Sequence, residues 1–173
     1  ATASDQLFTD RNGGLRSTRF DDIYYHPGQG AEESQHVFLA GNDLPNRWLI
    51  KDQKTLSKDY FVIAETGFGS GLNFLACWQL WRDSHHQGTA DHAPRTLYFY
   101  SSELYPLSSA ALIKSIRHYN PFPDLANELH NQYPDAIGGD YVIELDTDSP
   151  FPVVLVLLFG DSSEAFKRLE YYP

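Results

Sequence analysis

The chain has 173 residues, of which 42% are hydrophobic, and it contains a single cysteine, Cys77. This length supports one domain with its own core, and a lone cysteine excludes both an intrachain disulfide framework and a cysteine-based zinc site. The formal net charge of −10 argues against broad contact between this segment and a phosphate backbone. Because we find no long apolar run and no signal-peptide pattern, we expect a cytoplasmic protein without a membrane anchor.

The first 59 residues are expected to form an N-terminal extension that packs on the main part of the chain. Residues 20–25 mix aromatic and acidic side chains and predict a short strand. Residues 31–40 predict a helix, which Gly41 and Asn42 would close as a C-cap. Residues 43–59 are predicted to be a polar connector that contains Trp48.

The most informative stretch is residues 63–74, with the sequence IAETGFGSGLNF. The apolar run at 60–64 is typical of a parallel strand buried on both faces. Residues 72–82 contain no proline or glycine and predict a helix. The intervening turn places glycines at alternate positions, and a glycine loop between a strand and a helix presents free N–H groups to a nucleotide-like or carboxylate-bearing ligand.

The spacing within this turn narrows the choice of ligand. No lysine follows Gly71, which excludes a phosphate-binding P-loop, and Phe68 stands where a hydrolase nucleophile elbow needs glycine. The dinucleotide fingerprint is only partly met, because its third glycine comes one residue early. The remaining pattern, acidic-x-G-x-G-x-G from Glu65, resembles the first motif of Rossmann-like methyltransferases that use S-adenosylmethionine; a purely structural glycine turn is the alternative.

The helix at 72–82 carries apolar side chains on two faces, so we expect it to lie between the sheet and a layer that the N-terminal segment supplies. Cys77, inside this helix, is expected to be a small buried hydrophobe. Residues 83–94 are predicted to be a long polar loop. Its histidines are expected to be solvated rather than to bind a metal; they are His85, His86 and His92.

The second half of the chain predicts two further acidic strand ends. The aromatic run at 95–102 predicts a strand that ends in Glu103, where a carboxylate can accept hydrogen bonds from two ribose hydroxyls. An Asp just after the apolar run at 153–159, Asp161, is placed to accept from an adenine amino group. The other predicted elements are helices at 107–118, 123–132 and 163–169, and a strand at 141–145 that forms an antiparallel hairpin with 153–159.

Taken together, these features resemble the methyltransferase domain of the MnmC family, bifunctional enzymes that finish the methylaminomethyl group on the wobble uridine of some tRNAs. The matching segments follow the family's order through nearly the whole chain. They are residues 20–24, 32–33, 37–42, 65–75, 102–107 and 159–161.

The resemblance implies an α/β chain with a Rossmann-like S-adenosylmethionine-dependent methyltransferase fold. Residues 60–173 would be the first half of that domain, and residues 1–59 a small N-terminal α/β extension of the same single domain. The implied cofactor site has three parts: a methionine end, a ribose and an adenine edge. The resemblance implies that the methionine end is held by Glu65, Gly67, Gly69, Gly71 and Asn73. It implies that Glu103 holds the ribose and that Asp161 and Ser162 hold the adenine edge. Tyr24 would close over the cofactor.

The family's Asp-Gly-Phe motif, beside the transferred methyl group, does not occur before Pro173. We therefore name no catalytic residue, and we expect an unpaired edge on the strand at 60–64. The implied reaction needs a neutral amine on the tRNA base and a carboxylate to take its proton. The tRNA and a fused or separate flavin oxidase domain, which alone would bring FAD, are the implied partners. An NAD-dependent oxidoreductase and an inactive binding fragment remain alternatives.

Overall fold

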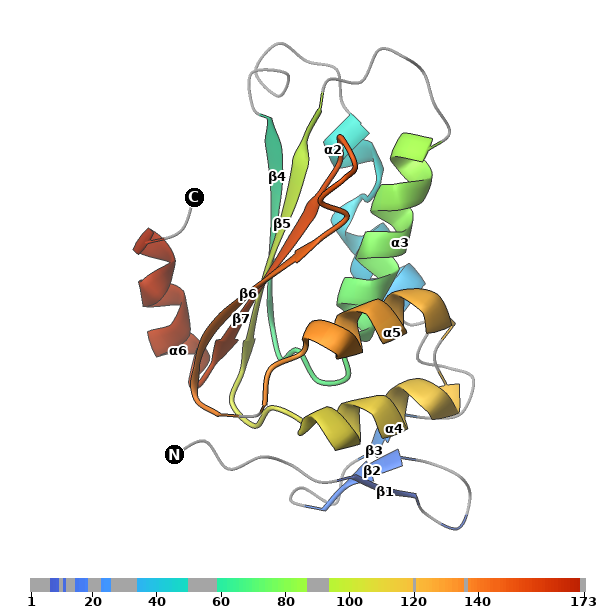
Figure 1. The fold of residues 1–173 in the computed structure, drawn as a ribbon, viewed down its shortest axis with the longest axis vertical. Coiled ribbons are helices and arrows are strands. Elements are labelled where there is room, and N and C mark those ends of the chain that lie inside the picture. Colours follow the sequence, from blue (N-terminus) through green and yellow to red (C-terminus); the bar gives the residue numbers. More distant parts are fainter. Residues whose placement is uncertain are drawn as a thin grey trace.

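The computed structural model describes residues 7–9, 11, 15–18, 23–25, 34–49, 59–86, 94–119, 121–135 and 137–171. Its centre is a four-stranded sheet with the order β4-β5-β7-β6 (Figure 1). The strands are β4 (Tyr60–Thr66), β5 (Thr96–Glu103), β6 (Gly139–Leu145) and β7 (Val153–Phe159). β4, β5 and β7 run parallel to one another, and β6 forms the predicted antiparallel hairpin with β7.

The central strand β7 has the sequence VVLVLLF and is buried along most of its length. Its side chains alternate between two apolar clusters, because successive residues of a strand point to opposite faces. Leu155 and Leu157 belong to the larger cluster, whereas Val156 and Leu158 belong to the smaller one. This two-sided burial explains why the sequence is a continuous apolar run rather than an alternating one.

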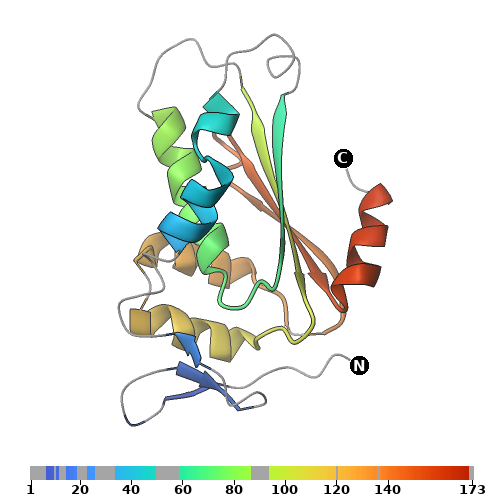
Figure 2. The ribbon, with the colours of Figure 1, turned by 180° about the vertical axis from the view of Figure 1, so that it is seen from behind.

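Helices cover both faces of the sheet (Figures 1 and 2). One face holds α3 (Leu72–His86), α4 (Ser109–Tyr119) and α5 (Pro123–Gln132). The other holds α6 (Ser162–Ala165) and the 3₁₀ turn η3 (Phe166–Tyr171), which pack on the smaller cluster. The α/β class with a mainly parallel sheet, predicted from the sequence, is therefore confirmed.

Helix α3 is buried on two sides, as its apolar stripes predict. Phe74 packs edge-to-face on Phe99 of β5, with ring centroids 5.2 Å apart. On another side Trp81 meets the fully buried Trp48 at 5.2 Å. Cys77 is completely buried, as expected, and burial together with the nearby Glu65 charge raises the pKa of its thiol.

The predicted loop at 83–94 is wrong at its start, because α3 continues to His86. Polar residues extend the helix here by local contacts: Gln79 Nε2 donates to Asp83 Oδ1 at 2.9 Å, and Ser84 Oγ donates to the Leu80 carbonyl at 2.6 Å. His85 is buried against Trp81, with ring centroids 4.2 Å apart. An apolar pattern alone could not locate a helix end that such contacts define.

Within the ranges that the structure describes, the N-terminal part contributes a second sheet and three short helical turns. The sheet is antiparallel, with β1 (Leu7–Thr9), β2 (Leu15–Ser17) and β3 (Ile23–Tyr25) in that order, and it lies beside α4 (Figure 1). The strand predicted at 20–25 is confirmed at residues 23–25, whereas residues 20–22 lie outside the described residues. The strands β1 and β2 were not predicted.

The turns of this part are the π-helical η1 (Ser34–Leu39), the 3₁₀ η2 (Ala40–Asn42) and α2 (Asn46–Leu49). The predicted C-cap at Gly41 and Asn42 is misplaced, since the left-handed capping residue is Asp43, with φ of 53°. The predicted polar connector is also wrong, because α2 carries the buried Trp48 into the core. Residues 31–33 and 50–58, which belong to these predictions, lie outside the described residues.

The remaining helices agree with the predictions to within two residues at each end: α5 matches the prediction at 123–132, α4 ends at Tyr119 instead of 118, and the helix predicted at 163–169 is α6 followed by η3. α4 begins at Ser109 rather than at 107, because Ser108 Oγ accepts a hydrogen bond from the Ala111 N–H at 3.2 Å and so caps the helix. α6 begins at Ser162, one residue earlier than predicted, because Asp161 is its N-cap.

Candidate functional site

The glycine loop and the end of β5 form one structure at the carboxyl end of the parallel strands. The N–H groups of Gly67 and Phe68 donate to the Ser102 carbonyl at 2.7 and 3.2 Å. The next donor in the loop, the Gly69 N–H, reaches Glu103 Oε2 at 2.9 Å. The structure therefore brings two predicted regions of the site into direct contact, with the side chain of one supporting the backbone of the other.

All three loop glycines have the left-handed backbone conformation that disfavours other residues. Their φ angles are 83° at Gly67, 56° at Gly69 and 77° at Gly71. A Cβ on Gly71 would also lie 2.8 Å from Cζ of the Phe68 ring, so this position is closed by packing. A Cβ on Gly67 would instead enter open space, which leaves room for a ligand against the loop backbone.

Glu65 is buried at the carboxyl end of β4 and is held by two neutral donors. Ser101 Oγ donates to Oε1 at 2.8 Å, and Asn73 Nδ2 donates to Oε2 at 3.2 Å. Burial raises the pKa of Glu65 to about 7, although both hydrogen bonds lower it, and the nearby Glu103 charge raises it further. Among the described residues, no lysine or arginine pairs with this carboxyl.

An open hollow of about 530 Å³ lies against Glu65 along the outer edge of β4. Glu65, Thr66 and Asn73 are its polar lining residues among those described. Two aromatic side chains, Phe38 of η1 and Phe166 of η3, also line it, together with Ala64. The buried carboxyl is thus next to a space of a size that a small molecule can enter.

Glu103 has both carboxylate oxygens engaged within the protein. Oε2 accepts from the Gly69 N–H and Oε1 accepts from the Tyr105 N–H, each at 2.9 Å. Its backbone carbonyl also accepts from the Gly160 N–H at 2.8 Å. A carboxylate offers about four acceptor positions, so these contacts leave capacity for a ligand hydroxyl.

Asp161 follows β7, so the three acidic positions lie on neighbouring strands in the order Glu65, Glu103, Asp161. Asp161 is exposed and accepts from the Ser163 N–H at 2.9 Å and from the Ser163 hydroxyl, and these bonds lower the pKa of its carboxyl. Ser162 is the first residue of α6. No hydrogen bond among the described residues joins either of them to the glycine loop.

Tyr24 lies in β3, and its side chain is outside the described residues. The small sheet that contains it is located beyond α4, at the end of the molecule where the parallel strands end (Figures 1 and 2). The prediction that Tyr24 closes over a cofactor therefore stays a prediction.

Sequence reasoning missed Ser101, which is fully buried and contacts Glu65 directly. The signal was present, since Ser101 and Ser102 interrupt the aromatic run TLYFYSSE of β5. A polar pair inside such a strand needs hydrogen-bond partners, and the residue opposite in the neighbouring strand is the first place to look.

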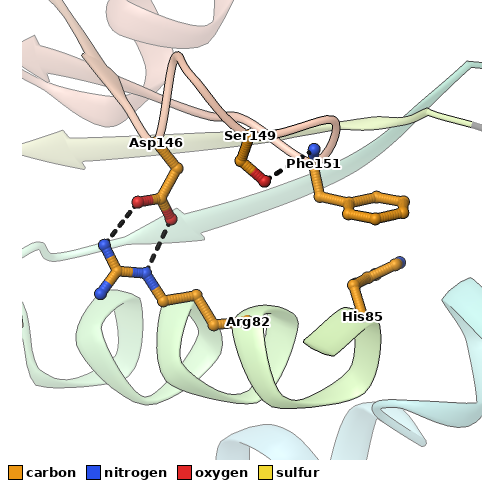
Figure 3. A pocket seen from close by; sticks show the side chains of 5 residues that line it. All are labelled: Arg82, His85, Asp146, Ser149 and Phe151. Carbon is orange, nitrogen blue, oxygen red and sulfur yellow. Dashed lines mark hydrogen bonds and ion pairs between the residues drawn. The ribbon is translucent and has the colours of Figure 1, made fainter. Parts of the chain in front are cut away.

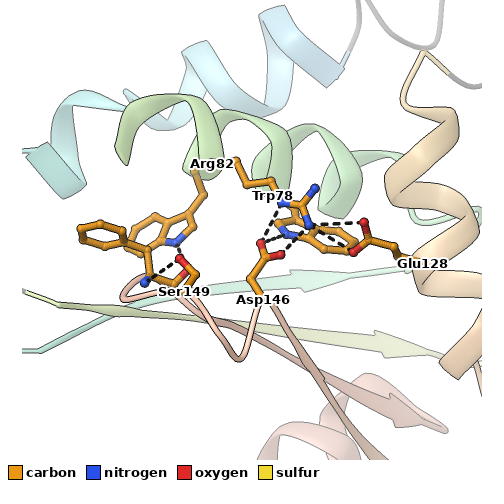
Figure 4. A network of polar contacts seen from close by, with 7 residues as sticks. Trp78, Arg82, Glu128, Asp146 and Ser149 are labelled. Atoms are coloured by element: carbon orange, nitrogen blue, oxygen red, sulfur yellow. Dashed lines mark hydrogen bonds and ion pairs between the residues drawn. The ribbon is translucent and has the colours of Figure 1, made fainter. Parts of the chain in front are cut away.

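A second hollow, of about 240 Å³, lies at the opposite end of the sheet (Figure 3). It is lined by Arg82, His85, Asp146, Ser149 and Phe151. Its charged groups are committed to one another: Arg82 Nε donates to Asp146 Oδ2 at 2.8 Å, and its Nη2 also contacts Glu128 at 3.1 Å (Figure 4). We therefore attribute this region to packing of the β6–β7 turn on α3.

Of the three histidines predicted to lie solvated in a loop, His85, His86 and His92, the structure describes the side chain of His85 alone. The prediction that His85 is solvated is wrong: its side chain is buried, and its Nδ1 lies 2.7 Å from the Trp81 carbonyl. The His86 side chain and all of His92 lie outside the described residues. Within the part of the chain that is described, no cluster of three metal-binding side chains occurs.

This geometry defines a Rossmann-like α/β protein with a glycine loop, and comparison with known proteins shows which proteins the chain is similar to. No family model matches the chain. The tRNA 5-methylaminomethyl-2-thiouridine biosynthesis bifunctional protein MnmC of Marinomonas sp. is 35% identical over 167 residues, and that of Vibrio vulnificus is 39% identical over 155. MnmC of Marinobacter nauticus is 38% identical over 161 residues.

These matches cover 96%, 90% and 93% of this chain but only 23%, 22% and 24% of the respective relatives. The resemblance to MnmC indicated by the motifs is confirmed: the chain is homologous to a segment that makes up about a quarter of those proteins.

The crystal structure of MNMC2 from Aquifex aeolicus superposes with a TM-score of 0.55 at 17% identity, over 95% of this chain and 45% of that one. At this identity the likeness concerns the fold alone, and it agrees with the predicted Rossmann-like class. None of the helices in the described ranges has the length and apolar character required to cross a bilayer.

Proposed function

We propose that this chain is the S-adenosylmethionine-binding part of a methyltransferase that acts on the aminomethyl amine of the wobble uridine in tRNA. The observation that carries the proposal is Glu65, a buried carboxyl without a cationic partner among the described residues, beside a glycine loop and an open hollow. Similarity to MnmC, whose name describes biosynthesis of a modified tRNA uridine, supports the same activity.

The residues present fit the cofactor by their chemistry. A carboxylate at the end of β4 suits the ammonium of the methionine end, since Glu65 is the one charged residue among the described residues that line the hollow beside it. The open space over Gly67 suits a close approach of the ligand to the loop backbone. Glu103, with acceptor capacity left, suits ribose hydroxyls.

In this proposal the bound cofactor supplies a methyl group that is already activated on a sulfonium. Glu65 orients the ammonium, with Asn73 and the glycines Gly67, Gly69 and Gly71 around it. Glu103 holds the ribose, Asp161 and Ser162 hold the adenine edge, and Tyr24 closes the site. Most of the rate enhancement then comes from alignment of the acceptor amine with the methyl group.

The acceptor and the proton-accepting group belong to the longer protein in this proposal. The chain spans about a quarter of the relatives' length, so tRNA binding and the group that takes the amine proton are not assigned to its residues. The relatives are named bifunctional, and a flavin oxidase domain with FAD is proposed only for a longer polypeptide. A tRNA substrate would place the reaction in the cytoplasm.

Isothermal titration calorimetry of the chain tests the cofactor. We expect S-adenosylmethionine and S-adenosylhomocysteine to bind and NAD not to bind. Glu65→Gln should weaken binding about 10- to 100-fold, because a hydrogen bond to a charged group is worth about 1.5–3 kcal/mol. The control is Glu144→Gln, an exposed change on β6, which should bind like the unmodified chain. Binding of NAD in preference to both other ligands would overturn the proposal.

A further inference from the structure

We propose that Ser101 is a positioning residue for the cofactor site: together with Asn73 it orients the buried Glu65 carboxyl, and binding of a ligand ammonium converts that carboxyl from the acid to the carboxylate, with release of its proton. This inference rests on the proposed function and adds to it a residue and a proton linkage. Ser101 touches no part of the ligand in this arrangement and acts through Glu65.

The position of Ser101 is fixed by the strand register rather than by the loop. Glu65 and Ser101 are direct partners in the parallel ladder that joins β4 to β5 from Tyr60↔Thr96 to Thr66↔Ser102. Ser101 is fully buried, so water cannot replace its hydroxyl, and its Oγ lies 2.8 Å from Glu65 Oε1. The strand pairing therefore keeps the Ser101 hydroxyl on one oxygen of Glu65, independently of the conformation of the glycine loop.

Among the described residues, the other groups that face Glu65 leave its charge uncompensated. Asn73 of α3 gives a neutral hydrogen bond to the second oxygen. In the same part of the chain, Cys77 of α3 and Glu103 of β5 are the titratable groups near it: the thiol is neutral because burial raises its pKa, and the Glu103 carboxylate repels a second negative charge. An ammonium in the adjoining hollow would supply the missing positive charge.

The proton balance of binding follows from these contacts. With the pKa of Glu65 raised to about 7, the free site holds the carboxylic acid below that pH. Binding of an ammonium then converts the acid to a carboxylate, and the proton leaves to solvent. The association constant should consequently fall about tenfold for each pH unit below about 7 and level off above it.

Removing the Ser101 hydroxyl makes ionisation of Glu65 harder. Loss of a hydrogen bond to a charged group should move the pH profile upward by about one unit, which corresponds to about 1.4 kcal/mol. A serine with a purely structural role would change the stability of the chain without moving this profile.

The experiment is calorimetric titration of the chain with S-adenosylhomocysteine between about pH 5.5 and about pH 8. Methylthioadenosine, which lacks the amino-acid tail, is the control ligand and should bind without this pH dependence. Ser101→Ala should shift the profile for S-adenosylhomocysteine only. Ser101→Thr, which keeps a hydroxyl, should restore it. Ser115→Ala, a matched loss of a buried hydroxyl in α4, should leave it unchanged.

A second measurement needs no ligand: the titration of the Glu65 carboxyl carbon, followed by NMR in the unmodified chain and in Ser101→Ala and Asn73→Ala. Each variant should titrate at a higher pH than the unmodified chain. Unchanged Glu65 titration in these variants, or an unchanged ligand profile in a folded Ser101→Ala, would overturn the inference. Failure of every adenosine ligand to bind, with the Glu65 titration shifted as expected, would instead overturn the proposed function alone.

Discussion

Glu65 links the chemistry of the site to the stability of the chain. Its carboxyl is buried, and its pKa in the folded state is about 7 instead of the ordinary 4.5. As pH rises from about 4.5 to about 7, the unfolded chain has already released this proton while the folded chain still holds it. The free energy of unfolding should therefore fall through this window and remain low above it.

Glu65→Gln should remove this contribution. The rise in the Glu65 pKa from 4.5 to about 7 lowers the free energy of unfolding by about 3 kcal/mol at pH values above that window. The variant should therefore be more stable than the unmodified chain at pH 8 by up to about that amount. At pH 4, below both pKa values, the advantage should disappear. Urea unfolding at both pH values measures it. A slope with pH that is the same in both proteins would contradict the expected role of Glu65.

The same residue would then lower stability and strengthen ligand binding. Such a trade between stability and function is common at binding sites, where an unfavourable group in the free protein becomes favourable with its ligand. The sequence revealed Glu65 because an acidic residue at a strand end next to glycines is a local pattern. Ser101 was not found, because its contact with Glu65, which is 36 positions away in the sequence, depends on the register between two strands.

At the scale of elements, the β6–β7 turn is fastened to α3 through one carboxylate. Asp146, whose φ is 54°, accepts from Trp78 Nε1 at 2.7 Å and from Arg82 Nε at 2.8 Å (Figure 4). The Arg82 guanidinium also lies over the Trp78 ring, 4.7 Å from its centroid. A second bond joins Trp81 Nε1 to the Phe151 carbonyl at 3.1 Å.

Asp146→Asn should lower the free energy of unfolding by about 2–3 kcal/mol, because it removes a partly buried charge that is paired and hydrogen-bonded. Asparagine also tolerates the left-handed backbone, so the change tests the charge rather than the turn. Glu128→Gln, at the more exposed end of the same Arg82 network, should cost less than about 1 kcal/mol. Equal losses in denaturant unfolding would show that Asp146 does not fasten this turn.

Most core elements could be predicted from the sequence, and the failures share a cause. Strands β4, β5 and β7 were predicted from runs of consecutive apolar residues, and the start of helix α5 from its proline. These signals lie within each element itself. β1, β2 and α2 were missed, since three- or four-residue elements depend on partners distant in sequence. In the site, Asn73 was predicted to contact the cofactor, but its hydrogen bond to Glu65 was not predicted, because no local sequence pattern indicates it.

At the scale of the whole molecule, the two edges of the main sheet differ. Among the described residues β4 pairs with β5 alone, and the unpaired edge expected on this strand stays a prediction for the rest of the chain. Beside this edge lie two hollows that share Phe38 and Ala64, of about 200 and 530 Å³. The opposite edge, β6, carries the charged side chains Asp140 and Glu144, which discourage strand addition; β4 has only the buried Glu65.

Val62→Lys should therefore reduce self-association of the chain at high protein concentration. Val62 is 44% exposed on β4, the edge strand without exposed charged side chains. A lysine at this position would disfavour pairing with an added strand, because that strand would bury its charge. Val142→Lys is the matched control, because Val142 is 52% exposed on the charged edge. Sedimentation velocity over a range of concentrations compares the two. If both variants associate as the unmodified chain does, β4 is not the site of self-association.

The bonds that hold the glycine loop also bear on how the chain folds. Gly69 and Glu103 are 34 positions apart, so the loop acquires its supporting contact only after β5 has docked on β4. Closing a chain segment of this length costs conformational entropy before the contact stabilises it. For this reason we expect assembly of the glycine loop to be a late, cooperative step of folding. A ligand bound there would in turn strengthen strand docking, and hydrogen exchange at Gly67 and Gly69 should slow together with exchange in the β4–β5 ladder.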